Sequence, residues 1–357
     1  MKAGDGNCGL SRGQNCSCNV KGQEIMKLIR TEDAVGHVLC HDLTQIIKDV
    51  KKDAVFRKGH VVTEDDIPVL LSIGKEHLYV FEKDDSMLHE DEAAKILERI
   101  CRSEHMKATE PKEGKISLLA ECDSVLKINR EKLITVNSLG EIMIATKRGD
   151  TLIKKGQGFA GMRVIPLVIS KEKMAAAEAA AGPEPILHLL PLKQKKCAIL
   201  ATGSEIFKGR IQDTFTPVVE EKLTSMGASV TDKRILDDSD PETTAAILDA
   251  IAKGAELVCV TGGMSVDPDD KTPLAIKNTG AEIITYGAPV LPGAMFLLAY
   301  FHKNDGTVVP VVGLPGCVMY ANRTIFDLVL PRLLADDPVT FAEIAALGEG
   351  GMLSQSI

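Results

Sequence analysis

The chain of 357 residues is longer than one typical domain, and its length alone predicts two or three compact units. Hydrophobic residues make up 45% and charged residues 26%, as in an average soluble globular protein, which excludes a wholly disordered chain and a fibrous repeat. The net charge of −8 and the absence of Trp argue against nucleic acid recognition by a broad basic surface or by base stacking.

The first residues are rich in Gly, Asn and Ser and lack an apolar period, so residues 1–22 are predicted to form a flexible tail. This segment holds Cys8, Cys16 and Cys18, whose spacing matches no common zinc pattern. The odd total of nine cysteines indicates reduced thiols rather than a disulfide framework. With no secretory signal and no apolar run near the roughly 20 residues that span a bilayer, the sequence predicts a cytoplasmic protein with no membrane contact.

Two smaller modules are expected next. Residues 23–105 are predicted as an α+β module with short strands at 37–39, 60–62 and 78–81, a helix from Thr63 to Gly74 and a helix at 90–101. Residues 106–182 are predicted as a mostly β module with strands at 132–136, 141–145 and 163–169. The alanine-rich segment 174–185, which closes with Gly182 and Pro183, indicates a helical spacer before a domain boundary.

A regular alternation of strands and helices follows and predicts an α/β domain over residues 183–340, with a tail at 341–357. The expected strands are 197–201, 229–236, 257–260, 282–286 and 308–312, and the expected helices are 213–227, 241–253, 272–278 and 318–334. Because most of these strands are apolar throughout, we expect a doubly wound, mostly parallel sheet with helices on both faces. In such sheets ligands bind beyond the carboxyl ends of the strands.

Four loops of this domain follow strands and carry unusual residues. They are residues 202–205 with Asp213 further on, the acidic segment 237–242, the Gly-Gly and acid segment 261–270, and the Gly-Leu-Pro-Gly turn at 313–316. A glycine pair after a strand lets the backbone approach a ligand and aim its amides at one point, which favours an anion site at Gly262 and Gly263. An ordinary tight turn is the alternative for both glycine-rich loops.

Acidic residues gather in the same loops. Asp213 and Asp240 are good candidates for helix N-caps, so part of the set is expected to be structural. The remaining carboxylates would repel a phosphate unless a cation intervened, which points to Mg²⁺, an ion held by one or two carboxylates together with ligand phosphate. No Walker loop, Gly-x-Ser-x-Gly elbow or His-Glu-x-x-His motif occurs, which disfavours P-loop, serine hydrolase and zinc protease chemistry.

Taken together, these loops resemble the molybdopterin-binding domain of molybdenum cofactor biosynthesis proteins, and the chain resembles a divergent molybdopterin molybdenumtransferase. The likeness covers residues 196–334, through Thr-Gly-Ser-Glu, Asp-Asp, Thr-Gly-Gly-x-Ser and Gly-Leu-Pro-Gly in that order. The resemblance implies a small-molecule pterin phosphate and molybdate as ligands or substrates, and Mg²⁺-dependent molybdate insertion. A homodimer and a molybdoenzyme or cofactor-assembly partner are further expectations of that likeness.

Site residues are assigned by position within these motifs. The expected catalytic residues are Asp270, Asp238 and Glu205, and the expected Mg²⁺ ligands are Asp237, Asp269 and Asp270. The residues expected to bind molybdopterin are Thr202, Gly203, Ser204, Asp213, Thr261, Gly262, Gly263, Ser265, Pro315 and Gly316.

The chain departs from the family pattern at several points, and other functions stay open. It lacks the family's Asp-Gly-Tyr-Ala segment, has no lysine in residues 291–294, and has Cys317 where the family has Asn. A non-catalytic carrier or sensor of the cofactor is therefore one alternative. Residues 203–205 and 269–272 also resemble the competence-damage-inducible family, which makes a Mg²⁺-dependent nucleotide pyrophosphatase the other alternative.

Overall fold

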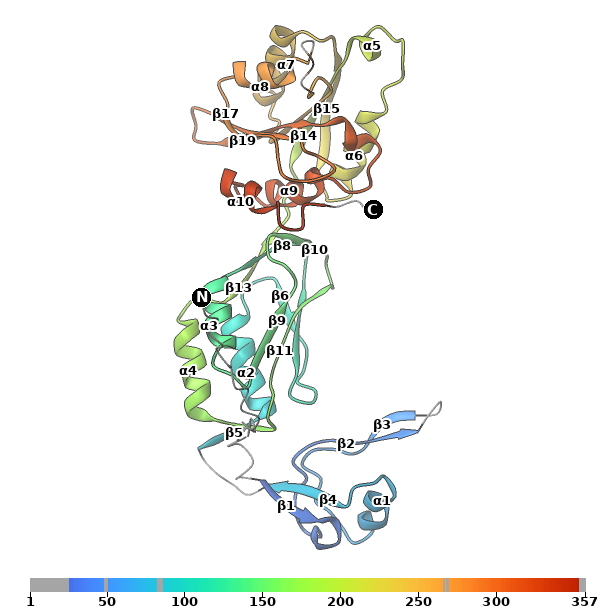
Figure 1. Cartoon of the computed structure of the whole chain (residues 1–357), viewed down its shortest axis with the longest axis vertical. Coiled ribbons are helices and arrows are strands. Elements are labelled where there is room, and N and C mark those ends of the chain that lie inside the picture. The colour runs from blue at the N-terminus through green and yellow to red at the C-terminus, as the bar shows by residue number, and fades with distance from the viewer. Residues whose placement is uncertain (1–25, 48–50, 82–85, 266, 268–269, 353–357) are drawn as a thin grey trace, which may run out of the picture.

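The computed structural model describes residues 26–47, 51–81, 86–265, 267 and 270–352. Three parts follow one another along the long axis of the molecule, with residues 26–81 at one end and the last domain at the other (Figure 1). The predicted tail at 1–22 lies outside the described residues. Among those that are described, no helix is both long and apolar enough to cross a membrane.

The first part contains two antiparallel strand pairs and one short helix. β1 (Met26–Arg30) pairs with β4 (His77–Phe81), β2 (Leu43–Ile47) pairs with β3 (Lys51–Phe56), and α1 spans Asp66–Ser72. The expected helix start at Thr63 is wrong by one turn: the Thr63 amide and hydroxyl both donate to Asp66 Oδ2, at 2.8 and 2.7 Å. The small core of this first part includes Leu39, Leu70 and Leu78. The expected strands at 37–39 and 60–62 meet only in an isolated bridge, Val38 to Val61.

The middle part combines three sheets, one of them a single strand pair, with three helices. Its four-stranded sheet has the order β6 (Met106–Ala108), β7 (Ile116–Ala120), β11 (Gly158–Val164), β9 (Ile142–Thr146). A three-stranded sheet has the order β10 (Thr151–Ile153), β8 (Ser124–Ile128), β13 (Leu187–Pro191), and β5 (Met87–His89) pairs with β12 (Val168–Ser170). The helices are α2 (Glu90–Cys101), α3 (Arg130–Asn137) and α4 (Lys171–Ala181).

The strand predicted at 132–136 is wrong, because these residues belong to α3. The Asn129 side chain accepts the amide of Lys132 and so caps the helix start. Asn137 at the other end of α3 exchanges hydrogen bonds with the backbone of Ile144 in β9, which fixes the helix against the sheet. Three of the five residues at 132–136 are apolar, at positions 133, 134 and 136, and this pattern led to the prediction of a strand.

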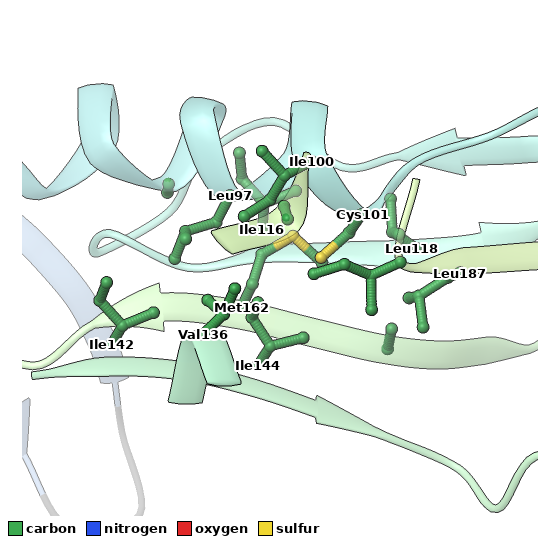
Figure 2. Packing of buried hydrophobic residues seen from close by; sticks show 14 of the residues in the cluster. Leu97, Ile100, Cys101, Ile116, Leu118, Val136, Ile142, Ile144, Met162 and Leu187 are labelled. Carbon is green, nitrogen blue, oxygen red and sulfur yellow. The ribbon is translucent and has the colours of Figure 1, made fainter. Parts of the chain in front are cut away.

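One hydrophobic core unites the middle part, and α2 belongs to it although the sequence grouped this helix with the preceding residues. Figure 2 shows Leu97, Ile100 and Cys101 of α2 facing Met162 of β11. Burial raises the pKa of the Cys101 thiol to about 12, so Cys101 packs as a neutral, apolar group.

We predict that Leu97→Ala destabilises the middle part by about 2–5 kcal/mol, because the side chain is fully buried and leaves a cavity. Ile134→Ala, which shortens a side chain that is 65% exposed, is the matched control and should change stability little. Urea unfolding of the full chain measures both. Equal effects of the two substitutions would contradict the assigned core.

A polar contact joins the first and middle parts. Nδ1 of buried His89 lies 2.6 Å from Lys58 Nζ and accepts the Asp91 amide, while Nε2 is 2.8 Å from the Cys40 carbonyl oxygen. These partners require the neutral tautomer that carries its proton on Nε2. Burial lowers the pKa of His89 below its ordinary value of 6.5. The hydrogen bond to the Cys40 carbonyl raises this pKa, whereas the nearby Lys58 ammonium lowers it further.

Because the folded pKa of His89 is depressed, the unfolded chain binds more protons in the window just below pH 6.5. The stability that His89 contributes is therefore fully present above pH 6.5 and is lost as the pH falls toward its folded pKa. The measurement is the unfolding free energy between neutral and mildly acid pH. In His89→Gln, which cannot titrate, the slope should be shallower; an unchanged slope would contradict this account.

The last domain is an α/β unit, which confirms the predicted fold class. Its six-stranded sheet has the order β15 (Ser229–Leu236), β14 (Lys196–Thr202), β16 (Leu257–Thr261), β19 (Val308–Leu314), β18 (Leu297–His302), β17 (Glu282–Tyr286). The first four strands are mutually parallel, whereas β18 runs antiparallel to both β19 and β17. Its helices include α6 (Phe215–Thr224), α7 (Asp240–Ala252), α8 (Thr272–Asn278) and α9 (Ile325–Leu334).

Alternate side chains of β14 point to opposite faces of this sheet, and helices cover both faces. Cys197 and Ile199 belong to a core shared with α6 and α9, whereas Ala198 and Leu200 belong to a second core shared with α7 and α8. Both sets are fully buried, which explains why the strand is apolar at every position.

Three predictions for this domain are corrected. Strand β18 was not expected, although Pro292 and Gly293 give a turn signal just before the apolar run 294–301 in which it begins. The single helix expected at 318–334 is divided into the 3-10 turn Gly316–Met319 and α9, because Thr324 and Asp327 form a capping box that starts a new helix. The expected tail at 341–357 begins with α10 (Phe341–Ala346), which buries Ile344.

Candidate functional site

The four loops singled out by the sequence all leave the same edge of the sheet. The parallel strands β15, β14, β16 and β19 are neighbours in that order, so their carboxyl ends lie side by side (Figure 1). β17 runs in the same direction as β19, since both are antiparallel to β18, and it ends at this edge too. Hydrogen bonds then join the loops in pairs.

Ser204 ties the loop after β14 to the acidic loop after β15. Its amide donates to Asp238 Oδ2 at 2.7 Å and its hydroxyl donates to Asp237 Oδ1. Asp237 also accepts the Asp238 amide at 2.9 Å, and Lys208 Nζ lies 3.9 Å from its other oxygen. The Ser204 hydroxyl, the Asp238 amide and the Lys208 charge all lower the pKa of Asp237. Two adjacent carboxylates are thus held at the start of α5 (Ser204–Phe207).

Thr202 and Gly262 hold the ends of β14 and β16 together. The Thr202 hydroxyl donates to the Thr261 carbonyl at 3.1 Å and lies 3.3 Å from the hydroxyl of Thr272 on α8. A Cβ on Gly262 would lie 2.1 Å from the Thr202 carbonyl oxygen, and the residue has φ +87°. Only glycine satisfies both conditions. The turn explanation of this glycine therefore holds, and it makes the two loops one rigid unit.

The backbone after Gly262 offers free donors. Gly263 also has a positive φ, +53°, and within the described part of the chain neither its amide nor that of Met264 has a hydrogen-bond acceptor. The Met264 side chain is buried against Gly313 of β19, where an added Cβ would lie 2.6 Å from Sδ, so the main chain is fixed here. In the same stretch the hydroxyl of Thr261 is buried and has no partner among the residues described. Unpaired donors of this kind suit an anionic oxygen.

The third loop folds back on itself. The Ser265 amide donates to Asp270 Oδ2 at 2.7 Å, and the Thr272 amide donates to the Gly263 carbonyl at 3.2 Å. Tyr286, at the end of β17, directs its hydroxyl toward the carbonyl oxygens of Met264 and Ser265, at 3.3 and 3.4 Å. Burial and the Asp270 charge raise the pKa of Tyr286, which keeps it a neutral donor.

The other predicted site residues have separate places. Asp213 accepts the amides of Phe215 and Thr216 at 2.9 and 3.0 Å, so it caps α6 as one of its two expected roles. Glu205 is exposed on α5, beside the tight turn at Gly203. Pro315 and Gly316 follow β19 at the same edge, the first buried and the second exposed. Asp269 lies outside the described residues.

The predicted Mg²⁺ site at Asp237, Asp269 and Asp270 stays a prediction, because Asp269 is not described. Apart from Asp269 and the other residues left undescribed, no group of three or more His, Cys, Asp or Glu side chains is placed to hold a metal ion. Asp237 and Asp270 belong to different loops, and each already accepts a hydrogen bond from its own neighbourhood. The adjacent pair Asp237 and Asp238 offers carboxylate oxygens, which suit a Mg²⁺ ion that takes its other ligands from phosphate and water.

Sequence reasoning missed Thr272, Lys208 and Tyr286 as members of this edge. Thr272 could have been found from its place at the first turn of a helix directly after the acidic loop. Tyr286 could also have been found, because a strand was expected at 282–286 and the carboxyl end of a parallel strand lies at this edge.

Comparison with known proteins agrees with this geometry. Residues 198–335 match the family model described as a probable molybdopterin binding domain. The last domain is therefore similar to the domain that this model describes. Residues 28–82 match a second model, a domain of unknown function, so no activity is assigned to that part. The resemblance to the molybdopterin-binding domain that was inferred from the loops of the last domain is thereby confirmed.

The curated relatives that match the chain include a molybdenumtransferase and a CinA-like protein. The molybdopterin molybdenumtransferase of Synechococcus elongatus is 28% identical over 178 residues, which are 47% of this chain and 40% of the relative. A CinA-like protein of Anaeromyxobacter dehalogenans is 39% identical over 74 residues, 21% of this chain and 18% of the relative. The chain therefore spans less than half the length of either relative. Among solved structures, the tungsten cofactor synthesizing protein MoaB from Pyrococcus furiosus is 22% identical, covers 40% of this chain and 89% of its own, and has a TM-score of 0.32.

We predict that Gly262→Ala separates the ends of β14 and β16, because the new Cβ would collide with the Thr202 carbonyl. Gly280→Ala is the matched control: its φ is +83°, but nothing lies within 4 Å of the new Cβ. The control should lose about 1–2 kcal/mol from the left-handed backbone alone, and Gly262→Ala should lose clearly more. Thermal unfolding compares the two, and equal losses would contradict the close approach.

Proposed function

We propose that the loop edge of the last domain binds the phosphate of molybdopterin, or of adenylated molybdopterin, as a step in molybdenum cofactor biosynthesis. The observation that supports this most is the pair of amides at Gly263 and Met264, which have no acceptor among the described residues and lie beside Thr202 at the end of β16. Donors held in place before the ligand arrives bind an oxyanion with little reorganisation. The match to a probable molybdopterin binding domain supports a pterin phosphate as this anion.

Mg²⁺ belongs to the same proposal. Asp237 and Asp238 are adjacent, ionisable and held by Ser204, and we assign the ion to their remaining oxygens. A bound Mg²⁺ would neutralise the repulsion between these carboxylates and the ligand phosphate. The acids themselves orient the ion and the pterin, and Asp270 stiffens the loop that carries the amides through its bond to Ser265.

The proposed reaction is transfer of molybdate to the pterin dithiolene, with Asp238, Asp270 and Glu205 positioning the ligands. The partial match to a molybdenumtransferase supports a transferase. Chemistry of this kind depends on positioning and on electrostatic stabilisation. A homodimer, a cofactor-assembly partner and a cytoplasmic location stay predictions.

The test is calorimetric titration of the full chain with molybdopterin and with adenylated molybdopterin, each with and without Mg²⁺. Asp238→Asn should weaken Mg²⁺-dependent binding about tenfold or more, because it removes one charge that holds the ion. The matched control is Asp305→Asn, which changes an exposed acid in the β18–β19 turn at the opposite edge of the sheet. Failure of both pterins to bind, or equal losses in both variants, would contradict the proposal.

One rival function has specific support, since a CinA-like relative also matches the chain. Under that alternative the same acids would orient water for Mg²⁺-dependent cleavage of a nucleotide pyrophosphate such as ADP-ribose. Incubation of the protein with ADP-ribose and Mg²⁺, followed by detection of AMP, distinguishes the two. Steady hydrolysis favours the pyrophosphatase, whereas tight pterin binding without turnover of either substrate favours a carrier.

A further inference from the structure

A cavity lies between the middle part and the last domain, away from the loop edge. It has a volume of about 270 Å³ and is bounded on one side by the turn before β10 and on the other by α9 and α10. Its lining includes four arginines, namely Arg130 and Arg148 of the middle part and Arg323 and Arg332 of the last domain. No side chain of the loop edge takes part in it.

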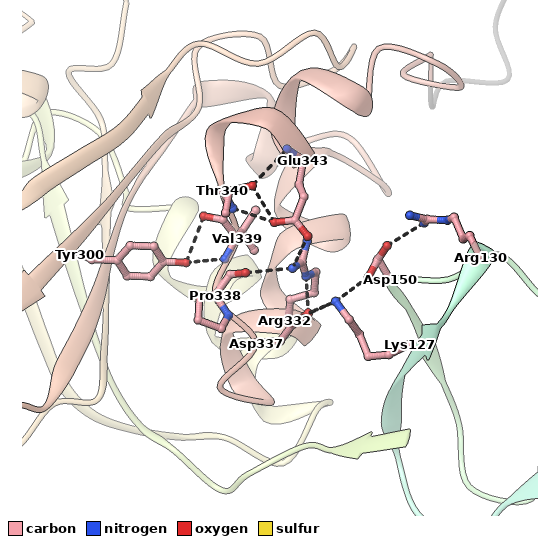
Figure 3. Close-up of polar contacts among 10 residues, drawn as sticks. All are labelled: Lys127, Arg130, Asp150, Tyr300, Arg332, Asp337, Pro338, Val339, Thr340 and Glu343. Atoms are coloured by element: carbon pink, nitrogen blue, oxygen red, sulfur yellow. Dashed lines mark hydrogen bonds and ion pairs between the residues drawn. The ribbon is translucent and has the colours of Figure 1, made fainter. Parts of the chain in front are cut away.

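Salt bridges occupy Asp150 and Glu343, two of the acids that line this cavity. Figure 3 shows Lys127 between Asp150 and Asp337, at 2.7 and 2.9 Å, and Arg130 on the other oxygen of Asp150 at 2.9 Å. Arg332, only 5% exposed, binds Asp337.

Glu343 is similarly engaged: it accepts from Arg332 at 2.9 Å and from the amide and hydroxyl of Thr340, both at 2.9 Å. The bonds of Glu343 fix α10 to α9, whereas the Lys127–Asp337 salt bridge joins the middle part to the last domain. The negative charges of Asp150 and Glu343 are thereby paired. Glu349 also lines the cavity, from an exposed position.

Two of the four arginines, Arg148 and Arg323, form no salt bridge with a described residue. Arg148 donates only to the Glu349 carbonyl oxygen, at 3.4 Å from both terminal nitrogens, and this distance is at the limit of a hydrogen bond. Arg323 precedes the cap of α9, and in the described structure neither Arg323 nor Arg148 has a carboxylate within 4.0 Å. Arginines come from both sides of the junction, so a bound anion would bridge the two parts.

The floor of the cavity is apolar. Leu328 and Val329 of α9 and Leu347 after α10, which we call the apolar floor, line the cavity together with the arginines. A site with a few convergent charged donors above an apolar floor is typical of small-molecule pockets. Arginine suits phosphate in particular because its donors form a planar fork.

We propose that this cavity binds a small organic phosphate, with the phosphate on Arg148 and Arg323 and the organic group on the apolar floor. Binding there would brace the last domain against the middle part. The site is separate from the proposed pterin site, and the inference does not depend on the proposed function.

The experiment is calorimetric titration of the full chain with AMP and, separately, with inorganic phosphate. Arg148→Gln and Arg323→Gln should each weaken AMP binding about tenfold, since each removes a charge-assisted bond. Arg57→Gln, an exposed arginine of the first part, is the matched control and should leave the affinity unchanged. Thermal midpoints of all variants verify that the fold is retained.

Inorganic phosphate should bind more weakly than AMP, because it leaves the floor uncovered. The proposal is overturned if AMP does not bind at about 1 mM, the range of weak specific ligands. It is also overturned if phosphate binds as tightly as AMP, or if the Arg148→Gln/Arg323→Gln double variant binds AMP as the unchanged chain does.

Discussion

The close approach of Gly262 to the Thr202 carbonyl is the constraint on which the candidate site depends. Two parallel strands end there at van der Waals contact, and an added Cβ at 2.1 Å has no room. Because Thr202 also binds Thr261 and faces Thr272, the same contact connects β14, β16 and α8. The amides of Gly263 and Met264 follow directly, so their direction is set by backbone packing rather than by flexible side chains. A preorganised anion site needs this kind of rigidity.

The acidic residues of these loops have different structural roles, which the composition of the loops does not reveal. Asp213 caps a helix, Asp270 stiffens its own loop through Ser265, and Asp237 and Asp238 anchor the first turn of α5. Sequence reasoning identified the loops as a set, because carboxyl ends of parallel strands meet at one edge. It could not tell which acids would stay available, since that depends on which amide each carboxylate reaches.

The fold was predictable to the extent that burial shapes the sequence. β14 and β16 are buried on both faces, so their residues are apolar without interruption and their lengths are evident. The prediction failed at β18, where the apolar run after Pro292 and Gly293 was not assigned a strand, and at α3, where the capping residue Asn129 decided the structure. The arginine cavity was not predictable at all, because Arg148 and Arg323 come together only through the packing of two domains.

The most direct test of the central claim observes the amides themselves. In ¹⁵N-labelled protein, addition of molybdopterin with Mg²⁺ should move the Gly263 and Met264 amide resonances more than any others and slow their hydrogen exchange. Resonance shifts confined to other edges of the domain, with these two amides unmoved, would contradict the account.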